Sequence, residues 1–242
     1  MELAVSVVVP VKNESSNVTP LIEEIVAALR GRETFEIIYI DDGSTDDTGA
    51  VLTALKARVP ELRPLRHQVN CGQSGAIRTG VLAAHGALIV TLDGDGQNDP
   101  ADIPALIEKF RAESGDGQLG LVAGQRRRRQ DTLSKRLASR FANRVRRWAL
   151  NDDTQDTGCG LKLMPREVFL RLPFFDHMHR FLPALVLREG LRVTFQSVNH
   201  RPRLHGTSNY SNLQRALVSI SDLLGVMWLK RRCRLPRAVK EL

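Results

Sequence analysis

Short apolar runs alternate, along the first half of the chain, with longer segments whose apolar positions recur at helical spacing. The runs predict buried strands at residues 4–9, 35–40, 63–67, 87–92 and 119–123. The longer segments predict helices at residues 18–30, 46–57, 76–84 and 103–112, with Thr45 or Asp46 capping the second. Strands that alternate with helices in this way are typical of a parallel sheet covered on both faces. The predicted fold class is therefore α/β, with a mostly parallel central sheet.

Three of these strands end in polar residues. The first is followed by Pro10 and Glu14, the second by Asp41 and Asp42, and the fourth by the sequence Asp-Gly-Asp-Gly-Gln at 93–97. Right-handed crossovers bring such strand ends to one edge of the sheet, where open α/β sheets bind their ligands. Carboxylate and amide oxygens on a tight loop suit Mg²⁺ or Mn²⁺, and a metal with few protein ligands can also hold phosphates. The pattern indicates a nucleoside diphosphate substrate, although such residues also favour plain surface turns.

After Gly124 the pattern changes. Apolar residues at helical spacing predict a basic amphipathic helix at residues 133–150, within a basic segment at 126–150 that either lies on a membrane or packs on the sheet with a solvated face. A second amphipathic helix is expected at residues 213–228, as a membrane-interface helix or as a core or oligomer helix. We expect a catalytic domain at residues 1–210 and a C-terminal helix with a basic tail at 211–242.

Composition narrows the class of protein. The hydrophobic content of 42% is ordinary for a globular protein, and the cysteines Cys71, Cys159 and Cys233 lack metal-ligand spacing and fit a reducing compartment. We find no signal-peptide pattern and no uninterrupted apolar stretch of about 20 residues, so we expect a cytoplasmic, peripheral protein. The net charge of +8 is concentrated at residues 126–147 and 230–240. Such patches attract polyanions, either nucleic acid or an anionic membrane.

Motifs along nearly the whole chain support one resemblance. They are Pro10-x-x-Asn13-Glu14, Asp41-Asp42-Gly43-Ser44-x-Asp46-x-Thr48, Asn70-x-Gly72-x-x-Gly75-Ala76, Asp93-Gly94-Asp95-Gly96-Gln97, Asp156-x-x-Cys159-Gly160-Leu161-Lys162, His179-Arg180-Phe181 and Arg203-x-x-Gly206-x-Ser208-Asn209-Tyr210. Together they resemble the family 2 glycosyltransferases of the GT-A fold, in particular the dolichyl-phosphate mannose synthases and bacterial polyprenyl-phosphate glycosyltransferases. The chain departs from the usual motifs at Lys12, where an aromatic residue is frequent, and at Asn209, where lysine is usual.

The resemblance implies a role for individual residues. The nucleotide base and ribose would be lined by Pro10, Lys12, Glu14, Ile40 and Asp42. The sugar nucleotide would also contact Asp93, Gly94, Arg126, Arg180, Arg203 and Asn209, with Arg126 and Arg203 at the diphosphate. The metal ion, Mg²⁺ or Mn²⁺, would be bound by Asp95 and Gln97. The residues expected to act in catalysis are Asp93, Asp95 and Arg203.

The implied activity is an inverting, metal-dependent transfer of a sugar from GDP-mannose or a UDP-hexose to a polyprenyl or dolichyl phosphate. It would take place at the inner face of the cell membrane, and a separate membrane protein could supply spanning helices. A phosphate monoester is mostly dianionic at neutral pH, so this acceptor needs no general base, and Asp156 is a candidate residue without an assigned role. The alternatives are a family 2 enzyme with another saccharide or cell-envelope acceptor, and a basic nucleic-acid-binding protein. The acidic strand ends argue against the latter, and we expect no nucleic-acid partner.

Overall fold

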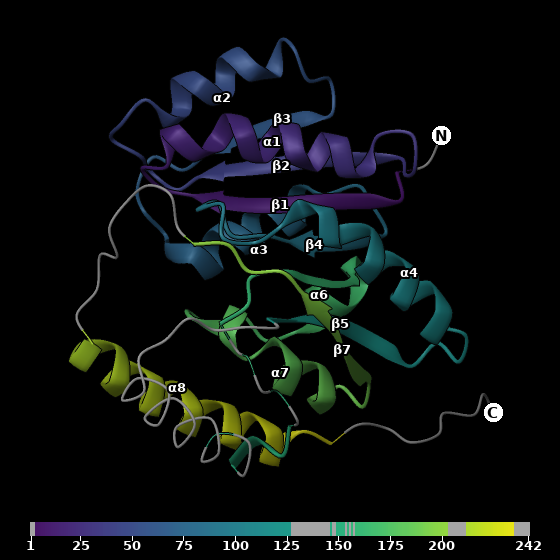
Figure 1. The fold of residues 1–242 in the computed structure, drawn as a ribbon. Coiled ribbons are helices and arrows are strands. Elements are labelled where there is room, and N and C mark those ends of the chain that lie inside the picture. The colour runs from purple at the N-terminus through teal and green to yellow at the C-terminus, as the bar shows by residue number, and fades with distance from the viewer. Residues whose placement is uncertain are drawn as a thin grey trace, which may run out of the picture.

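The computed structural model describes residues 3–126, 146, 149–152, 154, 156, 158–202 and 212–234, with side chains in the last stretch from 220 onward. Within these residues a seven-stranded sheet runs through the molecule in the order β3-β2-β1-β4-β6-β5-β7 (Figure 1). The strands are β1 Val5–Val11, β2 Phe35–Asp41, β3 Leu62–Arg66, β4 Leu88–Thr91, β5 Leu119–Arg126, β6 Lys162–Pro165 and β7 Arg192–Val198. The helices are α1 Ser15–Leu29, α2 Thr48–Lys56, α3 Gly72–Ala83, α4 Ile103–Glu113, α6 Arg166–Arg171, α7 Leu182–Arg188 and α8 Asn212–Arg232, with short 3₁₀ turns η1 Pro100–Asp102 and η2 Met178–Arg180. The predicted α/β class is confirmed.

Helices cover both faces of the sheet because its central strands are apolar on both sides. Val5, Val7 and Val9 of β1 pack in one hydrophobic cluster with α1, α2 and α4. The intervening Val8 packs in a second cluster with α3, α6 and α7. Successive side chains of a strand point to opposite faces, so a continuous apolar run is what a strand covered on both faces requires.

The predicted helix starts differ from the observed ones at α1, α2 and α3. Helix α3 begins at Gly72, before the predicted residue 76. At α1 and α2 the difference comes from hydrogen bonds that the two preceding loops exchange. Helix α1 begins at Ser15, before the predicted residue 18, and the Ser15 N–H donates to the Asp46 carboxylate at 3.2 Å. Helix α2 begins at Thr48, after the predicted residue 46. The Asp46 carboxylate accepts from both the N–H and the hydroxyl of Thr48, as the expected cap would, but Asp46 itself stays outside the helix.

The sheet is not parallel throughout. Strands β1, β2, β3 and β4 are parallel neighbours, as expected, and β5 is parallel to β7. Strand β6, which the sequence pattern did not predict, lies between β4 and β5 and is antiparallel to both. Its first residue, Lys162, is the register partner of Thr91 at the end of β4. An antiparallel strand therefore starts at the edge of the sheet where the parallel strands end.

Helix α8 confirms the second predicted amphipathic helix as a helix. It lies beside α7 at the β7 end of the sheet, far from α2 (Figure 1). Val226 is fully buried in the second hydrophobic cluster, whereas Ile220, Leu224 and Trp228 are 57%, 61% and 60% exposed. The exposed three are four residues apart and so share one helix face. None of the described helices combines the length and apolarity that crossing a membrane requires.

Part of the expected architecture lies outside the described residues. Of the basic helix predicted at 133–150, only Arg146, Ala149 and Leu150 are described. Arg146 forms an ion pair with the buried Asp152 at 2.9 Å, and Leu150 is fully buried. The division into domains at residue 210 remains a prediction.

A buried carboxylate holds the strands together at the edge opposite the polar strand ends. Glu36 of β2 is 3% exposed and accepts hydrogen bonds from the Ser6 hydroxyl at 2.7 Å and the His85 N–H at 2.6 Å. Its other oxygen forms an ion pair with Arg63. Burial alone would raise the pKa of Glu36, but these hydrogen bonds and the Arg63 charge outweigh it and lower the pKa below the ordinary 4.5.

Substituting Glu36→Gln is expected to lower the free energy of unfolding at pH 7 by about 2 kcal/mol, since buried donors lose a charged acceptor. A carboxyl group whose pKa is depressed by folding stabilises the protein above its unfolded-state pKa, and this contribution is lost as the pH falls through the folded-state pKa. The difference between wild type and variant should therefore shrink below pH 4.5. Urea unfolding across pH 3–8 measures it, with the exposed Glu23→Gln as control; a pH-independent difference would contradict the role given to this charge.

Candidate active site

The polar strand ends that the sequence singled out lie on neighbouring strands. Val11 of β1 is the register partner of Asp41, and the Asp42 N–H donates to the Val11 carbonyl at 2.8 Å. On the other side of β1, the Leu92 N–H donates to the Val8 carbonyl at 3.1 Å. A Cβ on Gly94 would overlap Val11, so the loop that begins at Asp93 packs directly on the end of β1. The three strand ends therefore form one continuous edge, as predicted.

The two loops after β1 and β2 brace each other. The Asn13 N–H donates to the Ser44 hydroxyl at 2.9 Å, and the Asn13 amide oxygen accepts from the Thr45 N–H at 2.8 Å. Asn13 has a φ of 56°, in the left-handed region that asparagine tolerates better than most residues. The Glu14 N–H donates to the Thr48 hydroxyl at 3.1 Å. These contacts give the motif that begins at Pro10 a structural function beside any binding function.

The predicted nucleotide residues differ in what they can offer a ligand. Pro10 and Glu14 are partly buried and Lys12 is exposed, so all three can contact a ligand at this edge. Glu14 is the N-cap residue of α1, and its carboxylate accepts from the Asn17 amide at 2.6 Å. The Ile40 side chain is fully buried against α3 near Gly80. Only its backbone can therefore line a nucleotide, which narrows the role expected for Ile40.

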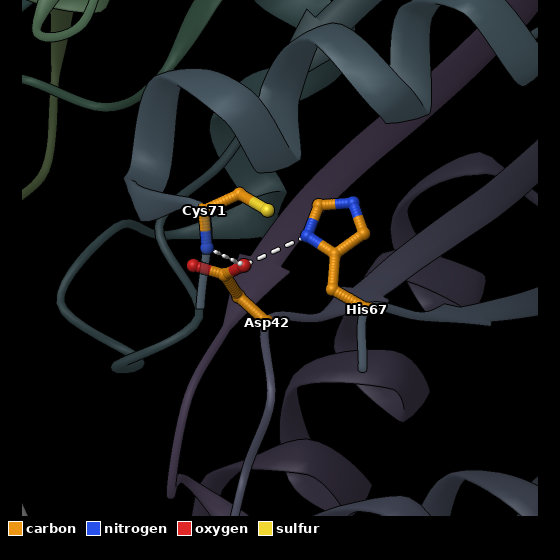
Figure 2. A group of neighbouring side chains, drawn as sticks. All are labelled: Asp42, His67 and Cys71. Atoms are coloured by element: carbon orange, nitrogen blue, oxygen red, sulfur yellow. Dashed lines mark hydrogen bonds and ion pairs between the residues drawn. The ribbon is translucent and has the colours of Figure 1, made fainter. Parts of the chain in front are cut away.

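Asp42 lies in a tight polar cluster with two residues that the sequence did not single out (Figure 2). One oxygen of its carboxylate, Oδ1, lies 2.7 Å from Nδ1 of His67 and accepts from the Cys71 N–H at 2.8 Å. The ligand atoms of Asp42, His67 and Cys71 all lie within 4.8 Å of one another. In the structure, the carboxylate and the ring are hydrogen-bonded to each other, whereas the Cys71 thiol donates to the Val69 carbonyl at 3.4 Å.

Asp93 is held from several sides. Its carboxylate accepts from the Gln73 amide at 2.8 Å, and its N–H donates to the Asn98 side chain at 3.2 Å. Burial and, after it, the charge of Asp95 raise the pKa of Asp93 to about 6, against the opposing effects of Lys162, Gln73 and Arg126. The two carboxylates thus carry negative charge that the protein only partly compensates.

The donor atoms of this loop fit a divalent cation. Asp95 and Gln97 offer a carboxylate and an amide oxygen from one tight turn, in which Gly96 has a φ of 75°. Asp95 Oδ1 accepts from the Gln97 N–H at 3.1 Å, which fixes the turn. Oxygen ligands of this kind suit Mg²⁺ or Mn²⁺, and an added positive charge would relieve the repulsion between Asp93 and Asp95.

Two cationic side chains face the acidic loop from β5 and β6. Arg126 pairs with Asp156 through Nε at 2.5 Å and Nη2 at 2.7 Å, with both side chains largely buried. Lys162 is buried, and its ammonium donates to the Cys159 carbonyl. Burial lowers the pKa of Lys162, against the opposing charges of Cys159, Asp93 and Asp156. Both cations can therefore attract an anionic group, such as a phosphate, to this edge.

Residues just before the predicted phosphate-binding motif lie against the loop at residues 93–97, where the metal is predicted to bind. The Arg201 N–H donates to the Gln97 carbonyl at 2.9 Å, and His200 forms an isolated antiparallel bridge with Asn98. The Arg201 guanidinium pairs with Asp99 at 2.5 Å and Glu24 at 2.7 Å. Arg203 and Asn209 themselves lie outside the described residues, so their roles remain predictions.

Arg180 lies in turn η2, next to His179. The His179 ring contacts the Ser74 hydroxyl at 2.7 Å through Nδ1. Burial, followed by the charges of Lys162 and Arg180, lowers the pKa of His179 well below its ordinary value, so this ring is neutral at pH 7. The turn thus packs on α3 beside the site, and the contact expected of Arg180 itself remains a prediction.

Sequence reasoning did not assign Gln73, His67 or Lys162 to the site. Gln73 and Lys162 each lie inside a recognised motif, but neither stands at the end of an apolar run. His67 follows a short, weakly apolar strand, and only the pairing of β2 with β3 brings it to Asp42. Gln73 could have been found as a polar residue at a variable position of its motif, and Lys162 as the charged residue that ends its motif. His67 carries no such signal.

Gly160 makes the position of Asp93 testable. A Cβ at residue 160 would overlap the Asp93 carboxylate, so Gly160→Ala must displace it. We expect the sugar-transfer rate that the motif resemblance implies to fall about 100-fold, the size of effect that a displacement of about 1 Å can cause. Gly115→Ala is the control, because no atom lies within 4 Å of a Cβ there. Equal transfer rates in initial-velocity assays of both variants would contradict a role for Asp93 at the reacting sugar.

Comparison with known proteins places this geometry in a family. Residues 6–172 match the family model "Glycosyl transferase family 2". A dodecaprenyl-phosphate galacturonate synthase from Rhizobium johnstonii is 36% identical over 95% of this chain and 68% of its own. An undecaprenyl-phosphate 4-deoxy-4-formamido-L-arabinose transferase from Yersinia enterocolitica is 36% identical over 91% and 66%. The chain thus spans about two thirds of the length of these relatives.

Solved structures show the same fold. A glucosyl-3-phosphoglycerate synthase from Mycobacterium tuberculosis, in complex with Mn²⁺, UDP and phosphoglyceric acid, has a TM-score of 0.71 at 20% identity and covers 98% of this chain and 80% of its own. A mannosyltransferase from Pyrobaculum calidifontis, in complex with GDP-Man and Mn²⁺, has a TM-score of 0.66 at 17% identity, with 98% and 66% covered. The expected GT-A fold is confirmed. The chain belongs to glycosyl transferase family 2.

Proposed function

We propose that this protein transfers a sugar, with inversion and with the help of a divalent metal ion, from a nucleoside diphosphate to a polyprenyl phosphate. The observation that carries the proposal is the single edge formed by Asp42, Asp93 and Asp95 on neighbouring strands, faced by Arg126 and Lys162. Such an edge offers acceptors for a nucleoside, oxygen ligands for a metal, and cations for a diphosphate. The acceptor class rests on the relatives, whose names state a dodecaprenyl or undecaprenyl phosphate.

The donor would lie along this edge with its nucleoside at the end of β2. Asp42 would accept from the base or ribose, beside Pro10, Lys12, Glu14 and the backbone of Ile40. Asp93 and Gly94 would contact the sugar nucleotide near the metal. The Gln73 hydrogen bond and the packing of Gly94 on Val11 support this arrangement, because they fix the loop before any ligand binds.

Asp95 and Gln97 would hold Mg²⁺ or Mn²⁺. When bound, the metal would stabilise the negative charge that develops on the departing nucleoside diphosphate. Arg126 and Arg203 would add guanidinium donors to the diphosphate oxygens, and Arg180 and Asn209 are further candidates for substrate contacts.

The acceptor would need little more than positioning. A phosphate monoester is largely dianionic at neutral pH, and one of its oxygens would form the new bond to the anomeric carbon as the bond to the nucleoside diphosphate breaks. No proton has to be removed. Asp156 is a poor general base, because both of its oxygens are engaged by Arg126.

We further propose that the protein binds the inner face of the membrane, where nucleotide sugars are available and a lipid-linked phosphate can be reached. The basic segment at 126–150 would hold the anionic head group, alone or with a separate membrane protein. The exposed face of α8 formed by Ile220, Leu224 and Trp228, hereafter the α8 ridge, supports this, because basic residues follow it at Lys230, Arg231 and Arg232.

The transfer reaction itself is the first test. Purified protein is incubated with UDP- and GDP-linked hexoses, undecaprenyl phosphate, and Mg²⁺, Mn²⁺ or EDTA, and the labelled lipid is measured. One donor class should give metal-dependent transfer, and Asp95→Asn should lower its rate about 100-fold or more. The exposed Asp116→Asn, with its ion pair to Arg192, is the matched control. Absence of both transfer and metal-dependent nucleotide binding in folded wild type would overturn the proposal.

Membrane binding has its own test. Replacing the three residues of the α8 ridge with glutamine should lower the affinity for vesicles containing phosphatidylglycerol about 10-fold. Each apolar side chain contributes favourable binding free energy when it moves from water into the lipid. Leu82→Gln on α3, where Leu82 is 55% exposed, is the control. Sedimentation with vesicles that contain or lack the anionic lipid measures the apolar and the charge contributions to binding. If the triple substitution leaves binding unchanged, the α8 ridge is not part of the membrane-binding surface.

A further inference from the structure

His67 connects three elements behind the nucleotide end of the site. It follows β3 directly, and its N–H extends the ladder by donating to the Asp41 carbonyl at 2.9 Å. Its ring lies between the end of β2 and α3, with Nδ1 2.7 Å from Asp42 and Nε2 2.9 Å from the Thr79 hydroxyl. The side chain is only 16% exposed. Both ring nitrogens therefore have a protein partner in a nearly closed environment.

These partners determine which nitrogen carries the proton. An ionised carboxylate only accepts hydrogen bonds, so Nδ1 must donate to Asp42. In the neutral ring, Nε2 then accepts from the Thr79 hydroxyl. This is the arrangement by which a histidine is fixed in one tautomer and orientation by the hydrogen bond on its far side.

The contacts to Asp42 are concentrated on one of its oxygens. Oδ1 receives both the His67 ring N–H and the Cys71 backbone N–H (Figure 2). Among the residues that the structure describes, none donates a hydrogen bond to Oδ2. Two donors on one oxygen fix the rotation of the carboxylate and leave the other oxygen to accept from a ligand.

We propose that His67 is a positioning residue for the donor nucleotide: it holds the Asp42 carboxylate so that Oδ2 can accept an N–H or O–H of the nucleoside. The inference rests on the proposed function, which gives Asp42 the nucleoside. The ligand class that fits is a nucleoside with a donor on its base edge or ribose, such as the imide N–H of uracil or the N–H groups of guanine. Thr79 acts through His67, and the Cys71 thiol has no part in this arrangement.

Two substitutions of His67 separate positioning from packing. In His67→Asn the amide nitrogen stands at the same distance from Cβ as Nδ1, so the donor to Asp42 is kept and the Thr79 contact is lost. In His67→Gln the amide reaches the level of Nε2, so the contact with Thr79 is kept instead. His67→Ala removes both, and Thr79→Val removes only the hydroxyl partner of the ring. The exposed His85→Gln, at the opposite edge of the sheet, is the control.

The affinity for UDP and GDP, measured by calorimetry with saturating Mn²⁺, should fall about 10-fold in His67→Gln and His67→Ala, the effect of losing a hydrogen bond to a charged group. It should fall no more than about 3-fold in His67→Asn and Thr79→Val. In the transfer assay the donor KM should rise with kcat unchanged. Inhibition by inorganic pyrophosphate should not change, because pyrophosphate has no nucleoside.

The outcomes separate this inference from the function on which it rests. If folded wild type binds no nucleoside diphosphate, the proposed function fails. If wild type binds and His67→Gln and His67→Ala bind equally well, only the positioning role is overturned. A loss in His67→Asn as large as in His67→Ala, or a parallel loss of pyrophosphate inhibition, would also overturn it, because packing rather than the Nδ1 donor would then matter.

Discussion

Repulsion between carboxylates at one edge of the sheet is the constraint around which the rest of the site is organised. Parallel pairing of β1 with β2 and β4 brings Asp41, Asp42, Asp93 and Asp95 to neighbouring strand ends. In the folded chain each is held by a donor: Ser44 for Asp41, His67 for Asp42, Gln73 for Asp93, and the Gln97 N–H for Asp95. Burial and, after it, the charge of Asp95 raise the pKa of Asp93, so the negative charge is only partly compensated at residues 93–97. A site in this condition favours cations, and through them phosphates.

The antiparallel strand β6 supplies part of the missing positive charge. Because it runs opposite to β4, its first residue lies beside the last residue of β4, and Lys162 comes to the acidic edge although it begins its strand. The chain leading into β6 contributes Asp156 and Gly160 to the same place. A sheet of parallel strands alone would have brought only strand ends to this edge, and therefore only the residues that follow apolar runs.

This topology explains which strands and site residues could be predicted from the sequence. The central parallel strands β1, β2 and β4 were predictable because each is a largely apolar run that ends in polar residues, and Asp42, Asp93 and Asp95 follow such runs. Strand β6 was not predictable in this way, since Lys162 begins it and only Leu163 and Met164 are apolar before Pro165. His67 and Gln73 were not predicted as site residues because their hydrogen-bond partners lie on other elements. Local sequence patterns carry no information about which elements pair. The helix starts at α1 and α2 were missed for the same reason, because the donors and acceptors that fix them are exchanged between two loops.

The fork between Arg126 and Asp156 has a consequence for how tightly a phosphate can be held. An arginine side chain loses about 2 kcal/mol of rotamer freedom when it is immobilised. For Arg126 this loss occurs on folding, because Asp156 already fixes two of its nitrogens in a largely buried position. A phosphate that binds Arg126 would contact a guanidinium that is already ordered. Part of the guanidinium charge is, however, already compensated by Asp156. The rotamer entropy of Arg126 is therefore lost when the chain folds and not when a phosphate binds.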